Sequence, residues 1–521
     1  MRAMPEPVRR RRRWLRWLVA AAALAGLLGG VAFATMRDEG DAFDPTVEFG
    51  APEPSPVVPQ PPTEPIGDER HPADDDFEWP VYGYTKARTH TLPLTRQLRP
   101  PFEKAWAVTG RTLLEFTPVL CGRSIFLLKN NGALYSISRT SGRVRWKRKL
   151  GNLAASSPAC SHGTVYNVLL SREEGVEAGR VVAVDADDGR TRWSRRLPSR
   201  SESSPLLDDG SLFFGTEDGT VYRLNADDGA IQWRYKAAGE VKGALALSDG
   251  KLFFGDYGGR VHAIDRETGR RVWSVAPRGA ANFYSSAAVA YGRVYLGGTD
   301  GAVYSLSART GRLAWRKQTG DFVYASPAVT TPDGGGPSVF IGSYNGKFYA
   351  LDARNGDTRW SRDVGGKISG AATVIGDLVF FSELEKTASW ALGVNTGQTV
   401  WKTDRGAFNP AISDGRRIYF LGYSSIFALD ADGVAFDAAG AQRRVERGEE
   451  RERAADEAQR QRERAAQRAQ QERSEKYRTA LHGHRHSNGR KGRHCHEHRH
   501  TYDVRGEIIS FTHEHCHSHT R

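Results

Sequence analysis

The sequence predicts an all-β fold of eight repeated four-stranded sheets, and three observations predict it. Tryptophans recur at nearly constant intervals, from 40 residues between Trp106 and Trp146 to 47 residues between Trp146 and Trp193. Short strands rich in β-forming residues alternate with tight turns, and no long apolar stripe of helical period separates the tryptophans. Such a repeat is typical of an eight-bladed β-propeller. The repeat tryptophans, which we expect to be structural, are Trp106, Trp146, Trp193, Trp233, Trp273, Trp315, Trp360 and Trp401.

Residues 1–36 carry a membrane-targeting pattern. The arginines of 9–13 precede an uncharged apolar run over 18–34, which at about 17 residues is near the lower limit for a membrane span. Because arginines stay on the cytoplasmic side, we expect a single-pass anchor in the cell membrane with the rest of the chain extracytoplasmic. The alternative is a signal peptide cleaved after Ala32-Phe33-Ala34.

Residues 37–76 are acidic and rich in proline, as in 52–54, 59–62 and 74–76. A segment with so little apolar content does not bury enough surface to fold by itself. The sequence therefore predicts a semi-extended linker between the membrane and the propeller.

The predicted propeller covers residues 77–433. A typical repeat contains a Ser-Pro lead-in such as Ser326-Pro327, an apolar strand such as 252–255, a hairpin turn such as Asp300-Gly301 and a third strand such as 303–306. A turn and a tryptophan strand complete it, as in 265–273.

The first and last strands of the propeller are predicted to share one blade. The last repeat contains the strand 426–429 and reaches Gly433 without a tryptophan strand, whereas 102–108 is a tryptophan strand with no blade before it. Pairing these strands would remove two exposed sheet edges. We therefore expect a ring closed by its N-terminal strand, with the indoles packed between neighbouring blades.

Cys121 and Cys160 lie at similar positions in the first two repeats, after Thr117-Pro118 and Ser157-Pro158. An oxidising compartment permits a disulfide between them. Two buried free thiols are the other interpretation, and the sequence leaves both open.

The repeat Asp-x-x-Thr/Asp-Gly-x-x-x-Trp, seen at 265–273, and the segment 79–84 followed by Arg88-Thr89 carry a family resemblance. The chain resembles the pyrroloquinoline-quinone-like (PQQ-like) β-propeller superfamily from Trp79 to about Gly433. That superfamily includes quinoprotein dehydrogenases and a non-catalytic, BamB-like branch. The resemblance implies the propeller fold. It also implies one of two functions, either quinoprotein dehydrogenase activity or a non-catalytic binding scaffold.

The catalytic features of that superfamily are not found in this sequence. The quinoprotein enzymes hold their cofactor beside a disulfide between adjacent cysteines and over a Ca²⁺ ion, but no two cysteines are adjacent here. Asp185, Asp265 and Asp352 recur at one repeat position, which is typical of turn formers. A fold alone implies no activity. We therefore expect a protein that is not an enzyme, with no catalytic or cofactor-binding residues in the propeller.

Residues 434–481 predict a charged, solvated helix, supported by i,i+4 pairs such as Glu449/Arg453 and Asp456/Arg460. The net charge of +13 and the pI of about 9.6 also permit an arm that binds polyanions. No nucleic-acid-binding motif is present, and we expect no nucleic acid partner.

The tail, residues 482–521, contains 11 of the 15 histidines. A two-residue turn at Arg505-Gly506 would pair its two halves as a hairpin, with imidazoles along one face and both cysteines on the other. Neutral imidazole is the commonest protein ligand for Zn²⁺, Cu²⁺ and Ni²⁺, so the tail predicts a transition-metal site. The candidate ligands are His494, His496, His498, His513, His515, His517, Cys495 and Cys516.

Three functions are compatible with these features. The first is a membrane-anchored extracytoplasmic propeller that acts as a protein-binding scaffold or envelope sensor and carries a metal-binding tail. Its partner would be an envelope protein or glycan that the sequence does not identify. The second is a quinoprotein-type, PQQ-dependent oxidoreductase. The third is a metal scavenger or chaperone displayed on a propeller.

Overall fold

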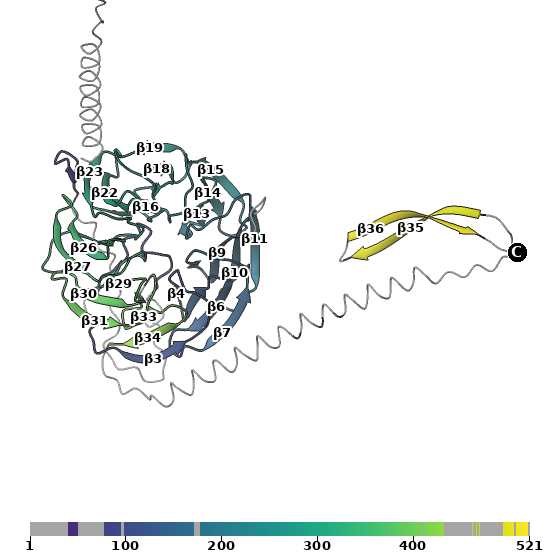
Figure 1. Cartoon of the computed structure of the whole chain (residues 1–521), viewed down its shortest axis with the longest axis horizontal. Helices are drawn as coiled ribbons and strands as arrows, with labels where there is room; N and C mark the ends of the chain where they lie inside the picture. Colours follow the sequence, from purple (N-terminus) through teal and green to yellow (C-terminus); the bar gives the residue numbers. More distant parts are fainter. Residues whose placement is uncertain are drawn as a thin grey trace, which may run out of the picture. The chain divides into compact units, whose positions relative to one another are not determined.

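The computed structural model describes residues 40–50, 78–94, 98–170, 178–409, 411–431, 493–504 and 507–518, and the helical positions 461, 465 and 468. The chain divides into two compact units, Met1–Glu449 and Glu450–Arg521. In the first unit, eight antiparallel sheets are arranged around a common centre (Figure 1). The predicted all-β, eight-bladed propeller is confirmed.

Each blade is a meander of short antiparallel strands. Blades one and two contain β4 (Val119–Cys121), β5 (Ser124–Leu128), β6 (Ala133–Ser138), β7 (Val144–Lys149), β8 (Ala159–Ser161), β9 (Thr164–Leu170), β10 (Gly179–Asp185) and β11 (Thr191–Leu197). Blades three and four contain β12 (Leu206–Asp208), β13 (Ser211–Gly215), β14 (Thr220–Asn225), β15 (Ile231–Lys236), β16 (Ala246–Ser248), β17 (Lys251–Gly255), β18 (Val261–Asp265) and β19 (Arg271–Val275).

The second half of the ring repeats this arrangement. Blades five and six contain β20 (Ala288–Ala290), β21 (Arg293–Gly297), β22 (Ala302–Ser307), β23 (Leu313–Gln318), β24 (Ala328–Thr330), β25 (Ser338–Gly342), β26 (Lys347–Asp352) and β27 (Thr358–Asp363). Blades seven and eight contain β28 (Thr373–Ile375), β29 (Leu378–Ser382), β30 (Ser389–Gly393), β31 (Thr399–Thr403), β32 (Ala411–Ser413), β33 (Arg417–Leu421), β34 (Ile426–Asp430) and the early strand β3 (Glu103–Val108).

The ring closes where the sequence predicts. Strand β3 pairs antiparallel with β34, so that Trp106 lies opposite Ala428 and Val108 lies opposite Ile426. Strand β34 continues to β33 and β32, which completes a four-stranded eighth blade. The closing strand and its partner therefore come from opposite ends of the propeller sequence.

The hydrophobic core lies between neighbouring blades. Phe348 of blade six stacks on Phe381 of blade seven with ring centroids 4.0 Å apart. Phe213 of blade three packs in one buried cluster with Phe254 of blade four. Neighbouring blades share these clusters, and one large cluster joins blade eight to both of its neighbours, blades seven and one.

The repeat tryptophans fix these contacts between blades. The Trp233 indole N–H donates a 3.0 Å hydrogen bond to the Arg266 carbonyl in the next blade, and its ring lies against Gly269. The same bond recurs at Trp106, Trp146, Trp193, Trp273, Trp315 and Trp360. Trp401 packs edge-to-face against Phe102 and Phe420.

The linker prediction is wrong for residues 40–50. Strand β1 (Ala42–Phe43) pairs antiparallel with β23, as a fifth strand at the edge of blade five. Val47 is buried, and the Arg293 Nη2 group donates a 2.7 Å hydrogen bond to its carbonyl oxygen. Phe49 stacks on Tyr291 at 5.2 Å. The reason is that blade five offers an open edge, which local composition does not reveal.

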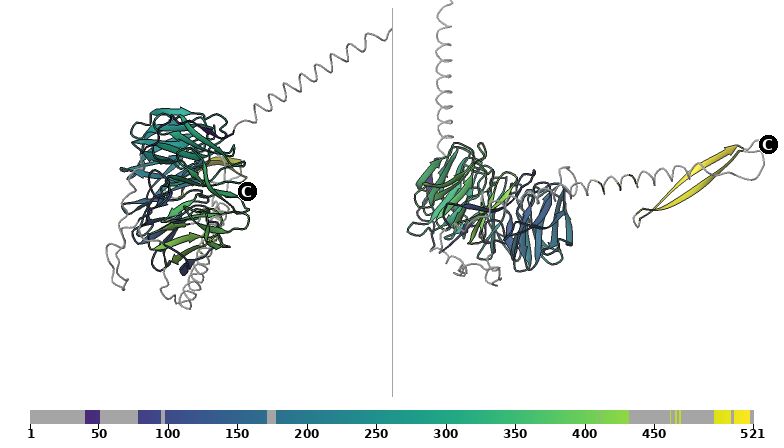
Figure 2. Two further views of the ribbon diagram at one scale, coloured as in Figure 1. Left: turned by 90° about the vertical axis from the view of Figure 1, so that its left-hand side faces the viewer. Right: turned by 90° about the horizontal axis from the view of Figure 1, so that it is seen from below.

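The second unit contains a two-stranded antiparallel hairpin, β35 (Arg493–Val504) and β36 (Glu507–Ser518), seen as a long twisted ribbon in Figure 2. The predicted membrane anchor, the rest of the linker and most of the charged helix lie outside the described residues. Within the part of the chain that the structure describes, no helix is long and apolar enough to span a bilayer.

Candidate functional site: a pocket at the centre of the ring

Residues 79–92, here named the central segment, lie in the middle of the ring and form backbone hydrogen bonds with a series of blades. Their carbonyl oxygens accept hydrogen bonds of 2.8–3.0 Å from the backbone N–H groups of the innermost strands. The pairs are Trp79 with Leu120, Pro80 with Cys160, Lys86 with Leu247, Ala87 with Val289, Thr89 with Val329 and His90 with Val374. Strand β2 (Thr91–Leu92) then pairs in parallel with β28. The central segment therefore crosses the middle of the propeller.

Arg88 fixes the centre of this segment. Its guanidinium is fully buried, and Nε donates a 2.9 Å hydrogen bond to the Leu245 carbonyl. Nη2 donates to the Ser204 and Pro205 carbonyls at 3.2 and 3.1 Å, and Nη1 donates to the Tyr82 carbonyl. One side chain thus joins blades three and four to the central segment.

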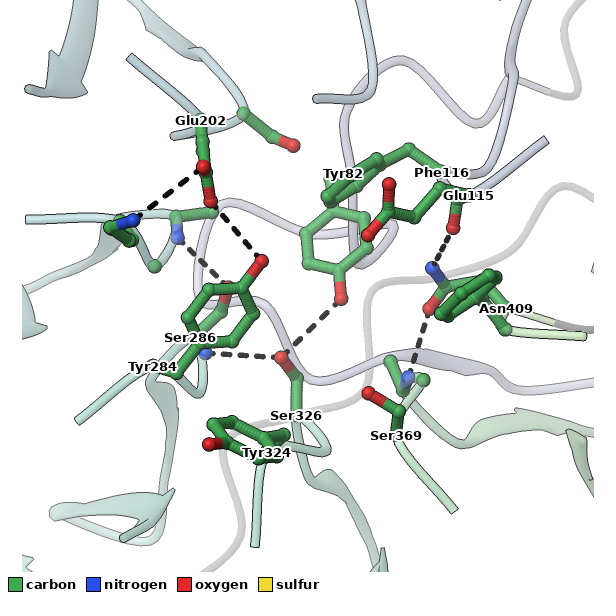
Figure 3. Close-up of a pocket in the computed structure, with 17 residues that line it drawn as sticks. Tyr82, Glu115, Phe116, Glu202, Tyr284, Ser286, Tyr324, Ser326, Ser369 and Asn409 are labelled. Atoms are coloured by element: carbon green, nitrogen blue, oxygen red, sulfur yellow. Dashed lines mark hydrogen bonds and ion pairs between the residues drawn. The ribbon is translucent and has the colours of Figure 1, made fainter. Parts of the chain in front are cut away.

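A pocket lies beside the central segment, with Tyr82 in its wall (Figure 3). Its volume is about 500 Å³ including its open mouth. Six residues of its lining occupy one position of the repeat, four residues before the innermost strand of their blade, as Glu202 precedes Leu206 at the start of β12. They are Glu115, Glu202, Lys242, Tyr284, Tyr324 and Ser369.

The Ser-Pro lead-ins join neighbouring blades at the inner end of this pocket. The Ser204 hydroxyl accepts a 2.9 Å hydrogen bond from the Ser157 N–H of the preceding blade. Ser326 accepts one of 3.0 Å from the Ser286 N–H and one of 3.3 Å from the Tyr82 hydroxyl. Figure 3 shows the two bonds at Ser326, which join the Ser286 backbone and the Tyr82 ring at the pocket wall.

Carboxylates outnumber cations on one side of the pocket. Lys242 Nζ lies 3.6 Å from Glu202 Oε1, 3.7 Å from Glu217 Oε1 and 3.7 Å from Glu240 Oε2, and Arg200 Nε lies 3.6 Å from Glu217 Oε2. Three carboxylates thus face two cations. Burial raises the pKa of Glu217, and the nearby Lys242 partly offsets this effect.

Aromatic side chains of blades four to six form an arc beside these charges. Tyr284 lies edge-to-face with Tyr324 at 5.5 Å, and Tyr324 lies 4.9 Å from Tyr344. Tyr257 lies 6.2 Å from Tyr284, whose hydroxyl donates a 3.3 Å hydrogen bond to Glu202. Burial raises the pKa of Tyr284, and the charges of Glu202 and Glu115 raise it further, so its phenol remains a neutral donor.

The cysteines and aspartates of the propeller have structural roles. Cys121 and Cys160 form a disulfide between blades one and two, with their Cα atoms 6.4 Å apart. Asp185, Asp265 and Asp352 each accept a backbone N–H two residues ahead through Oδ1, as turn formers do. The disulfide resolves the alternatives that the sequence leaves open.

The backbone of the tail brings the predicted metal ligands into opposed pairs. The pairs are His494 with His517, Cys495 with Cys516, His496 with His515, and His498 with His513. This is the register that a turn at Arg505-Gly506 implies. In the propeller, within residues 40–50, 78–94, 98–170, 178–409 and 411–431, no group of three His, Cys, Asp or Glu side chains is arranged to hold a metal ion.

The lining of the pocket has no excess positive charge for the quinone cofactor of the PQQ-like enzymes. That cofactor is a planar tricarboxylate, and the charged lining residues are Glu115, Glu202 and Lys242, which sum to one negative charge. Lys242 is already shared among three carboxylates. The adjacent cysteine pair of those enzymes has no counterpart in the sequence. By itself the lining therefore offers a tricarboxylate no net compensating charge, which would have to come from the Ca²⁺ ion that accompanies the cofactor in those enzymes.

Comparison with known proteins agrees with the fold. The family model described as outer membrane protein assembly factor BamB matches residues 130–242, 177–403 and 325–477. BamB from Moraxella catarrhalis has a TM-score of 0.52 at 17% identity over 64% of this chain and 98% of that one. A quinohemoprotein alcohol dehydrogenase from Pseudomonas putida has a TM-score of 0.57 at 14% identity over 69% and 81%.

A quinohemoprotein alcohol dehydrogenase from Comamonas testosteroni has a TM-score of 0.56 at 13% identity over 68% of this chain and 80% of that chain. No curated protein matches the sequence. The structural likenesses at these identities show the fold, and the family model covers more than half of the chain. The chain belongs to the PQQ-like β-propeller family of outer membrane protein assembly factor BamB.

Proposed function

We propose that this protein is a non-catalytic, membrane-anchored extracytoplasmic scaffold or envelope sensor with a transition-metal-binding tail. The observation that carries the scaffold function is the match to the BamB family model over more than half of the chain. BamB is by its name an assembly factor, and a scaffold of this family would bind its partner through the propeller.

The disulfide supports the extracytoplasmic location. Disulfides persist in oxidising compartments and are rare in the cytosol. The arginine cluster before the apolar run supports the same orientation, with the propeller outside. Protease treatment of intact cells or spheroplasts tests this proposal. Digestion of the propeller without lysis is the expected result, and complete protection would contradict it.

The paired histidines of the hairpin support the metal-binding tail. Cross-strand neighbours about 5 Å apart can share one ion, and a two-stranded hairpin needs such additional stabilisation in water. Titration calorimetry of the full chain with Zn²⁺ and Cu²⁺ should show saturable binding that is lost when residues 482–521 are removed. Equal binding by both proteins would place the metal elsewhere.

The quinoprotein alternative rests on the likeness to the two alcohol dehydrogenases. Incubation of the full chain with the quinone and Ca²⁺, followed by dye-linked oxidation of alcohols and sugars, tests it. We expect no turnover above a boiled-protein control. Turnover would show that the protein is an enzyme. The remaining alternative is a metal scavenger displayed on the propeller. If it is correct, deletion of residues 482–521 should abolish the entire cellular phenotype of the protein.

A further inference from the structure

We infer that the central pocket binds an organic cation, namely a primary ammonium or guanidinium group. Such a group could belong to a free amine or to a lysine or arginine side chain of a partner polypeptide. The inference goes beyond the scaffold function, because a free amine would make the pocket a small-molecule site.

The charge of the pocket is the first argument. The chain carries a net charge of +13, yet the charged lining residues Glu115, Glu202 and Lys242 sum to one negative charge. Nearby, Glu217 and Glu240 add two carboxylates, and Arg200 and Lys367 add two cations, so the net charge of the surroundings stays at one negative charge. The local sign is therefore opposite to that of the whole molecule. Charge complementarity of this kind selects cationic ligands.

The aromatic arc is the second argument. Cations are attracted to the faces of aromatic rings within about 6 Å of the ring centroid. Two cations of the chain already use this arc, because Lys242 Nζ lies 5.2 Å from the centroid of Tyr257 and Lys367 Nζ lies 5.7 Å from that of Tyr344. A ligand cation beside Tyr284 and Tyr324 would be attracted to the faces of these rings in the same way.

The shape of the pocket is the third argument. The central segment crosses the ring, and the buried Tyr82 ring closes the pocket from that side. The pocket is open on its other side, so the terminal group of a side chain or of a small amine can reach its polar lining. Carboxylate oxygens of Glu202 and the Ser369 hydroxyl, which among the described residues accepts only one hydrogen bond, from Tyr344, are the acceptors that an ammonium group needs.

Titration calorimetry of the full chain tests the inference with matched probes. Cadaverine represents a free amine. Nα-acetyl-lysine N-methylamide, whose ε-ammonium group is free, represents a polypeptide side chain. Nα-acetyl-norleucine N-methylamide is its uncharged isostere. We expect saturable binding of at least one cationic probe and at least about tenfold weaker binding of the isostere. Tighter binding of the capped lysine would identify a polypeptide as the source, and tighter binding of cadaverine a free amine.

Two substitutions with opposite expected effects make the test specific. Glu202→Gln removes a carboxylate without changing its shape and should weaken cation binding about tenfold, whereas the exposed Glu385→Gln outside the pocket should leave it unchanged. Lys242→Met removes the internal competitor and should tighten binding several-fold. A folding defect would not produce this gain.

Any of these outcomes would overturn the inference: equal binding of the lysine and norleucine probes, weaker cation binding in Lys242→Met, or binding of an anion such as citrate that depends on Lys242. Saturable Ca²⁺ binding lost in Glu202→Gln, without binding of either amine, would equally overturn it. Failure here leaves the scaffold function intact, because the protease and metal experiments do not involve the pocket.

Discussion

Single glycines decide how closely one blade packs on the next. Gly269 has a φ of +68°, and a Cβ atom placed there would lie 2.7 Å from Cδ2 of Trp233. Gly250, in the same blade, has a φ of +67° and no neighbour within 4 Å of the same position. The two residues share a backbone conformation and differ in their surroundings, which separates conformational strain from steric contact.

Gly269→Ala should therefore destabilise the protein more than Gly250→Ala. Both changes cost about 1–2 kcal/mol for a positive φ, and Gly269→Ala adds about 1–3 kcal/mol because the indole must shift. Chemical denaturation of both variants measures the difference in free energy of unfolding. Equal losses would mean that the indole moves freely, against its hydrogen bond to Arg266.

His90 makes acid stability depend on the central segment. Burial, and to a lesser extent the Arg88 charge, together lower the pKa of its imidazole to about 3. The ring lies edge-to-face with Tyr82 at 4.7 Å. The neutral form is thus kept in the folded state, whereas the unfolded chain binds a proton near pH 6.5. Stability contributed by the neutral form is lost as the pH falls below 6.5 toward 3.

His90→Gln should remove this contribution. Between pH 7 and pH 5 the native protein should lose about 2 kcal/mol more unfolding free energy than the variant, because only its unfolded state gains a proton at this position. Urea unfolding of both proteins at pH 5, 6 and 7 measures the difference. Parallel curves would contradict the buried neutral imidazole.

At the scale of the element, β1 shows how an edge strand is recruited. Asp44 donates its backbone N–H to the Ala314 carbonyl at 2.7 Å, and Asp41 Oδ1 accepts the Gln318 N–H at 2.9 Å. Val47 and Phe49 then cover the side of blade five. The strand is short, but it ties the start of the described chain to the ring.

Replacing residues 42–49 by a Gly-Ser linker should destabilise blade five locally. Loss of the buried Val47 side chain alone costs about 1.5–3 kcal/mol of unfolding free energy. The backbone groups of β23 also lose their pairing with β1. Hydrogen exchange should accelerate in β23, while β27 of blade six serves as the internal control. Uniform acceleration in both strands would instead indicate a global effect.

The same element shows what sequence reasoning could reach. The turn chemistry, the period of the tryptophans and the unpaired strands at 102–108 and 426–429 predicted all eight blades and their closure, because these signals are local or repeat regularly. The docking of 40–50 depends on an edge more than 260 residues away, as Ala42 pairs with Arg316. Composition carries no information about such a distant partner.

The pocket could have been found from the repeat but not from any motif. Its residues are chemically unlike one another, so no single window of sequence distinguishes Glu202, Lys242 or Tyr284. They share only a position, four residues before the innermost strand, and the ring symmetry brings that position to the centre in every blade. Aligning the repeats on their tryptophans would have assembled all of them but Tyr284, because each of the others lies nine residues after a repeat tryptophan.

At the scale of the whole molecule, stability rests on the join between β3 and β34. The two strands are separated by more than 300 residues, so their pairing closes a large loop that ordinary blade contacts do not. The Trp106 indole donates to the Arg139 carbonyl of blade one at 3.0 Å and lies 5.8 Å from Tyr419 of blade eight. It therefore contacts both sides of the join.

Trp106→Ala should lower the free energy of unfolding more than Trp146→Ala does. Both tryptophans are buried and make the same bond to the next blade, so each loss of packing costs on the order of 3–5 kcal/mol. Trp106→Ala in addition frees the closing strand and exposes two sheet edges. Calorimetric unfolding of both variants measures this excess, and hydrogen exchange should locate it in blades eight and one. Equal losses of unfolding free energy in the two variants would mean that packing between neighbouring blades alone stabilises the propeller, and that closing the ring adds nothing to stability.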